Sequence, residues 1–163
     1  MEVMKLKNEN MEMVQNIVTE LEKYASGGYF LHHGELFPID YDDFNAIEGC
    51  SYNEEVYILP DGKEILEGNI EPASLFDYFN DFLDVDYIVD SQKQFKAVRV
   101  MVTCGGPNIF IDSYSGEVQL YWWSERATAV IPAIICNEIN AVFQEFYYCW
   151  SRFRWGRRCL PHS

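Results

Sequence analysis

Residues 105–124 read GGPNIFIDSYSGEVQLYWWS, two apolar runs joined by a short polar link. A glycine loop that binds phosphate needs a helix after it, and usually a lysine. Here Gly105-Gly106-Pro107 precedes an extended apolar run, no lysine follows closely, and Pro107 offers no N–H. The stretch therefore predicts two strands, Asn108–Asp112 and Glu117–Ser124, with a tight link before each of them.

Two more strands are expected just before this stretch, over Val85–Asp90 and Phe95–Thr103. Val98, Val100 and Val102 alternate with other residues, which is the period of a half-buried strand. The links SQKQ, CGGP and SYSG are short, and short links join antiparallel neighbours. We expect an antiparallel β-meander of about four strands.

Helical periodicity marks both ends of the chain. A first helix is predicted over Glu9–Tyr24, with its apolar face at Val14, Ile17, Val18 and Leu21, and with SGG ending it. A last helix begins near Pro132 and should pack on the sheet through Ile135, Ile139, Val142, Phe146 and Cys149. Between them, PDG at 60–62 predicts a small hairpin of Val56–Ile58 and Glu64–Leu66.

These elements predict an α+β fold in which the meander packs against the C-terminal helix, beside an N-terminal helix and a small hairpin region. Residues 1–150 are expected to form a single domain. Residues 151–163 read as a basic tail outside the fold, which we expect to be disordered.

Acidic residues dominate the composition, with 26 Asp and Glu against 12 Lys and Arg and a net charge of −14. Residues 1–90 carry a net −17 and residues 91–163 a net +3. The electrostatic field of so much negative charge repels nucleic acids and anionic membranes and attracts basic proteins. No apolar run is long enough for a membrane span, and the N-terminus has no signal-like segment, so the bacterial cytoplasm is the expected compartment. The five cysteines are odd in number and lack C-x-x-C spacing, which predicts free, mostly buried thiols.

A second helix is predicted from about Pro72, with Ser74 and Asp77 as a capping pair. Its polar side would carry Asp77, Asp81 and Asp84 at i, i+4 and i+7, about 5–6 Å apart along the axis. Nucleic-acid phosphates repeat at a comparable spacing of about 6–7 Å. We therefore expect an acidic row that binds a basic cleft, formed by Asp77, Asp81, Asp84, Asp86 and Asp90, with Asp42, Asp43, Glu54 and Glu55 as secondary candidates.

Catalytic and metal-binding patterns are weak. His32, His33 and Glu35 form the best metal candidate, but adjacent histidines on a strand point to opposite faces and a third ligand is not identifiable. No nucleophile elbow or cysteine-protease signature is present. We expect no catalytic residues, no metal and no cofactor, and keep a small metallohydrolase as an alternative.

Tyr121 and Trp123 are expected on the sheet face opposite Trp122, which should anchor the core. Such aromatic residues can form a protein contact patch. This leaves open an adaptor or regulatory domain of a mobile element that binds proteins through its sheet face. An exposed edge strand also leaves a homodimer possible.

The pattern VTCGGPNIFIDSYSGEVQLYWW, preceded by DFLDVDYIVDSQKQFKAVRVMV and followed by a helix ending FQEFYYC, resembles small acidic proteins of phages and mobile elements in gut Firmicutes. The resemblance covers roughly residues 77–149. Proteins of this size and charge resemble anti-CRISPR and anti-restriction inhibitors. The resemblance implies an inhibitor of a host defence system and does not identify its target. Together with the acidic row, it leads us to expect a non-enzymatic inhibitor of a host defence nuclease, a CRISPR effector such as Cas9, that acts as a nucleic-acid mimic.

Overall fold

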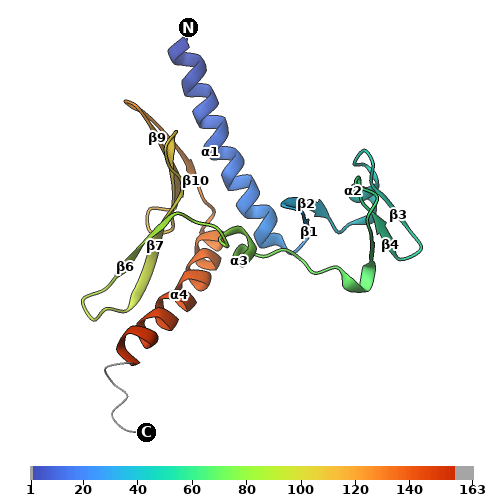
Figure 1. Ribbon diagram of the computed structural model, residues 1–163. Coiled ribbons are helices and arrows are strands. Elements are labelled where there is room, and N and C mark those ends of the chain that lie inside the picture. The colour runs from blue at the N-terminus through green and yellow to red at the C-terminus, as the bar shows by residue number, and fades with distance from the viewer. Residues whose placement is uncertain (1, 157–163) are drawn as a thin grey trace. The chain divides into compact units, whose positions relative to one another are not determined.

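The computed structural model describes the backbone of residues 2–156 and the side chains as far as Cys149. It is an α+β fold: in chain order a long helix comes first, antiparallel sheets follow, and a second long helix comes last, which confirms the predicted fold class (Figure 1). The chain divides into two compact units. Unit 2 is Glu22–Tyr78, and unit 1 comprises the residues up to Leu21 together with those from Phe79 onward.

Unit 1 is built on a five-stranded antiparallel meander in the order β10-β9-β8-β7-β6. The strands are β6 (Asp84–Val89), β7 (Phe95–Thr103), β8 (Asn108–Asp112), β9 (Glu117–Trp122) and β10 (Glu125–Val130). The predicted meander is thus confirmed, and β10 is the strand that the prediction missed. Its segment ERATAV buries only the small side chains Ala127 and Ala129, so its apolar alternation is faint in the sequence.

The links of the meander are turns held by their own side chains. Asp112 Oδ1 accepts hydrogen bonds from the backbone N–H groups of Tyr114 and Ser115, at 2.9 and 3.0 Å. Gly116 follows at φ +73°, a conformation that glycine adopts without strain. Gly105, at φ +88°, lies in the link between β7 and β8. Both glycines therefore serve strand connections, as predicted.

Helix α4 (Ala133–Gly156) contacts β7 and buries Ile135, Ile139 and Val142. Phe146 and Cys149 were predicted to continue this stripe, but both are exposed. The apolar anchor of the helix is instead Phe143, which is fully buried and touches the ring of Phe79 edge-on at 4.9 Å. The helical backbone runs on to Gly156, so residues 151–156 of the predicted tail are helical. Residues 157–163 lie outside the described residues.

Helix α1 (Glu2–Ser26) begins earlier than predicted. Val14, Val18 and Leu21 are buried as expected, and Ile17 is half-buried. The helix ends where Gly27 adopts φ +71°, which is the usual left-handed stop. None of the helices in the described part of the chain is long and apolar enough to cross a membrane.

Unit 2 contains two small antiparallel sheets. The first pairs β1 (Tyr29–His32) with β2 (Glu35–Pro38). The second has the order β3-β4-β5, and β4–β5 is the predicted hairpin around PDG. The remaining elements are β3 (Ser51–Asn53), β4 (Val56–Ile58), β5 (Glu64–Leu66), the helices α2 (Tyr41–Asn45) and α3 (Leu75–Tyr78), and the 3-10 turn η1 (Glu67–Asn69).

The core of unit 2 is aromatic. Phe44 and Tyr57 are fully buried, with ring centroids 4.9 Å apart in an edge-on contact. Phe30 and Phe37 pack against them from the β1–β2 hairpin. Large aromatic side chains bury much area per residue, which lets a short segment with little regular structure hold together.

The predicted second helix is wrong in extent, because α3 ends at Tyr78. Its cap is the predicted one, with the backbone N–H of Ser74 donating to Asp77 Oδ2 at 2.8 Å. The chain then turns into the sheet: Leu83 N–H donates to the carbonyl of Met101, and Asp84 is already in β6. Asp77, Asp81 and Asp84 therefore do not form a helical row, since pairing with β7 overrides the helical pattern.

Four described cysteines are free thiols, which confirms that part of the prediction. Cys50 and Cys136 are buried, whereas Cys104 and Cys149 are exposed. Burial raises the pKa of both buried thiols, so they remain protonated near neutral pH. Cys159 lies outside the described residues.

Candidate functional site: an acidic unit and a two-histidine cluster

The negative charge of the chain is concentrated in unit 2. This unit holds thirteen Asp and Glu and two Lys, a net charge of −11. The rest of the sequence holds thirteen acidic and ten basic residues, a net charge of −3. Most of the net negative charge of the protein therefore lies on one compact unit, and not on one face of a helix.

Glu54 and Glu55 form the turn between β3 and β4, because Asn53 pairs directly with Val56. Both glutamates have positive φ, at +48° and +68°. A two-residue turn of this kind prefers Asn-Gly, and a left-handed L-residue costs about 1–2 kcal/mol. The turn therefore carries two adjacent, exposed carboxylates in a conformation that disfavours their residue type.

Asp42 and Asp43 lie in the first turn of α2 and are exposed. Asp43 N–H donates to Asp40 Oδ1 at 3.0 Å, which caps the helix. Acidic side chains in a first turn also favour the helix electrostatically. These two carboxylates therefore serve the local fold and at the same time add to the acidic surface.

The five primary sequence candidates are divided between the units, with Asp77 in unit 2 and the others in unit 1. Asp90 Oδ1 accepts hydrogen bonds from the backbone N–H groups of Gln92 and Gln94, and Asp84 Oδ1 accepts one from Val85. Since Asp77 caps α3, three of these five aspartates stabilise the local backbone through hydrogen bonds. Asp81 and Asp86 are simply exposed.

The sheet face of unit 1 places Tyr121 opposite Asn108 and Arg126, and the Arg126 guanidinium lies 5.5 Å from the Tyr121 ring centroid. Trp123 does not lie on this face. It is 88% exposed at the turn after β9, with φ +55° and its ring edge-on to Trp122. Trp122 is half-buried, whereas Leu120 and Val118 on β9 are fully buried and anchor the sheet.

His32 and His33 come together with Asp61 rather than with Glu35. Nε2 of His32 lies 2.9 Å from Asp61 Oδ2, and Nε2 of His33 lies 3.9 Å from the same oxygen. The two imidazole rings are 4.1 Å apart between centroids. One ligand atom from each residue falls within 4.8 Å of the others.

This cluster overturns the sequence argument about opposite faces. His33 does not belong to β1 but to the two-residue turn before β2, because His32 pairs with Glu35. Its φ of +49° and that of Gly34, +80°, show a left-handed turn, in which strand alternation does not apply. The missed residue Asp61 comes from the PDG turn, and its position in the sequence gives no sign of this partnership.

A second polar cluster in unit 2 joins two tyrosines to one carboxylate. Tyr41 donates to Glu67 Oε1, Tyr52 donates to Oε2 at 2.8 Å, and the two rings stack 4.0 Å apart. The hydrogen bonds from Tyr41 and then Tyr52 lower the pKa of Glu67. Burial, followed by the hydrogen bonds with Tyr41 and Glu67, raises the pKa of Tyr52. Both tyrosine hydroxyls are directed to one acceptor residue, which indicates a structural network.

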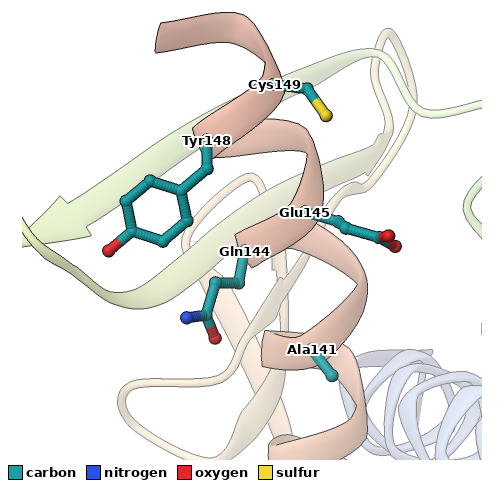
Figure 2. A pocket seen from close by; sticks show the side chains of 5 residues that line it. All are labelled: Ala141, Gln144, Glu145, Tyr148 and Cys149. Carbon is teal, nitrogen blue, oxygen red and sulfur yellow. The ribbon is translucent and has the colours of Figure 1, made fainter. Parts of the chain in front are cut away.

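Unit 1 has a pocket of about 470 Å³ beside α4, lined by Ala141, Gln144, Glu145, Tyr148 and Cys149 (Figure 2). Tyr148 hydrogen-bonds Gln94 at 3.0 Å, so its hydroxyl holds the helix to the β6–β7 link. The pocket lining contains none of the sequence-predicted site residues. It offers one carboxylate and one thiol, which do not make a catalytic arrangement.

No protein-family model, curated protein or solved structure matches the chain.

Proposed function

We propose that this chain is a non-enzymatic protein that binds a basic, nucleic-acid-binding partner through the acidic surface of unit 2. The observation that carries the proposal is the net charge of −11 on that unit alone. Like charges gathered on a small unit repel one another, and a basic partner relieves that repulsion. The resemblance to phage inhibitors makes a host defence nuclease, such as a CRISPR effector, the expected class of target.

The turn at Glu54 and Glu55 supports the same proposal. Its left-handed backbone would accept Asn-Gly with less strain, so the two glutamates lower rather than raise the stability of the fold. Strained backbone of this kind often accompanies a functional role. We place the centre of the partner-binding surface at this turn, with Asp42 and Asp43 as further carboxylates of the same unit.

The experiment is a capture assay with an RNA-guided CRISPR nuclease, performed with the full chain at low and at high salt. Binding should weaken as salt rises, because long-range attraction between exposed charges is screened. The variant Glu54→Asn/Glu55→Gly should bind more weakly although its turn is less strained. The matched control is Asp84→Asn/Asp86→Asn, which removes two carboxylates from β6 of unit 1 and should bind as the wild type does.

If binding does not depend on salt, or if both double variants weaken it equally, the partner-binding surface is not the acidic surface of unit 2. If the nuclease is not bound at all, the same variants used with a bacterial lysate test the more general proposal. A basic nucleic-acid-binding protein should then be recovered at low salt, and the unit 2 variant should lose it.

Trp123 favours a second candidate function. An 88% exposed tryptophan on a strained turn is a typical hot-spot residue, and it would suit an adaptor that binds another protein through an apolar contact. Trp123→Gly should then abolish partner binding while the double variant of unit 2 retains it. The reverse result supports the acidic surface.

A further inference from the structure

Two hairpins of unit 2 bring two imidazoles and a carboxylate close together. His32 is the last residue of β1, His33 is the first residue of the following turn, and Asp61 lies in the turn between β4 and β5. The elements that supply them belong to different sheets. Their convergence is therefore a product of the tertiary structure and not of local sequence.

We propose that His32, His33 and Asp61 bind a divalent transition-metal ion of the zinc type. Zinc ligands that each lie about 2.0–2.1 Å from the ion in a tetrahedron are about 3.3 Å from one another. The ligand atoms of His32 and His33 lie 2.9 and 3.9 Å from Asp61 Oδ2, so small side-chain adjustments reach that geometry. Three protein ligands leave a fourth position for water or for a group of a partner.

The carboxylate of Asp61 is already oriented for this role. Its Oδ1 accepts the backbone N–H of Lys63 at 3.0 Å, which leaves Oδ2 facing the two imidazoles. Outer hydrogen bonds of this kind fix metal ligands in proteins.

Accessibility and backbone strain both agree with a binding role. The side chain of His32 is 11% exposed, whereas those of His33 and Asp61 are 77% and 45% exposed, so an ion can enter from the solvent. His33 occupies a left-handed position at φ +49°, where Asn would be favoured. A hydrogen bond between His32 and Asp61 would not need an imidazole at position 33.

The ligand set selects the class of ion. Two imidazole nitrogens with one carboxylate suit zinc and its neighbours among the transition metals, whereas magnesium and calcium prefer oxygen ligands. The net charge of unit 2 attracts any cation, so the experiment must separate ligation from this general attraction.

The experiment is a calorimetric titration of the metal-free full chain with Zn²⁺. The variants are His33→Asn, which removes the imidazole and suits the turn, and Asp61→Asn, which keeps an acceptor for Lys63 N–H. The control is Glu64→Gln, which removes one exposed carboxylate from the same hairpin. Circular dichroism verifies that each variant is folded.

Wild type and Glu64→Gln should bind one equivalent of Zn²⁺ with similar affinity, in the presence of excess Mg²⁺. His33→Asn and Asp61→Asn should each weaken binding by at least about tenfold. Absence of saturable binding, competition by Mg²⁺, or wild-type affinity in His33→Asn would overturn the proposal. The readout is independent of the partner, so this proposal and the proposed function fail separately.

Discussion

Nε2 of His32 and Oδ2 of Asp61 lie 2.9 Å apart although the two residues are 29 positions apart in the sequence. The contact joins the hairpin β1–β2 to the hairpin β4–β5, which belong to different sheets of unit 2. His32 is the last residue of β1 and Asp61 lies in the turn between β4 and β5, so this polar contact ties the two hairpins together. The same pair supplies two of the three ligands proposed for a metal ion.

The turn at His33 gives the first prediction. Replacing His33 by Asn should raise the free energy of unfolding by about 0.5–1 kcal/mol in buffer with a chelator, because Asn tolerates the left-handed backbone better. Urea denaturation of the two proteins measures the difference. His33→Ala, which retains the strain, is the control and should not be stabilised.

Addition of Zn²⁺ should reverse this order of stability. A ligand that binds only the folded state stabilises it, and wild type holds the ligand set that His33→Asn lacks. If both proteins gain the same stability from zinc, His33 is not a ligand.

Glu67 gives a prediction about the stability of the fold at acidic pH. Its pKa is lowered from 4.5 by the hydrogen bonds with Tyr41 and Tyr52, so it contributes stability above pH 4.5, and this is lost as the pH falls through the lower folded-state pKa. The free energy of unfolding should therefore decline steadily below about pH 5. In Glu67→Gln the decline should be shallower and start from a lower value at pH 7. An equal decline in wild type and in Glu67→Gln would contradict the lowered pKa of Glu67.

Tyr52 gives the corresponding prediction about the stability of the fold at alkaline pH. Its pKa is raised from 10.0, first by burial, so the stability it contributes is present below pH 10 and is lost as the pH rises towards the folded-state pKa. Tyr52→Phe should show less loss of stability above pH 10 than wild type, because it has no hydroxyl to ionise. Spectrophotometric titration of the tyrosines checks the raised pKa directly, and a tyrosinate signal that is complete near pH 10 would contradict it.

The sequence predicted β7 and β8 to the residue, because strict alternation and turn residues mark a half-buried strand on a local scale. The same reasoning extended the helix after Pro72 too far. Leu75, Phe79 and Phe82 have helical spacing, yet the helix ends at Tyr78 and the chain pairs with β7 from Leu83 onward. This pairing is a contact between two strands, and the local pattern around Pro72 does not indicate where the helix gives way to it.

The sequence indicates only part of the two-histidine cluster, for a related reason. His32, His33 and Gly34 follow an apolar run, and Gly at the second place of a two-residue turn is a usable hairpin signal. It would have shown that strand alternation does not apply to His33. Asp61, in contrast, approaches through the tertiary packing of unit 2, so the sequence could not indicate it.

Helix α4 provides the last prediction, since its apolar anchor differs from the predicted stripe. Phe143 is fully buried against Phe79 and Phe82, whereas Phe146 is 43% exposed. Phe143→Ala should lower the free energy of unfolding by about 3–5 kcal/mol, because the cavity it leaves cannot collapse fully. Phe146→Ala removes the same atoms one turn further along the helix and should cost about 1 kcal/mol or less, because part of its ring is already in water. Urea denaturation followed by circular dichroism compares the two, and similar losses in both variants would mean that the helix packs through the predicted stripe after all.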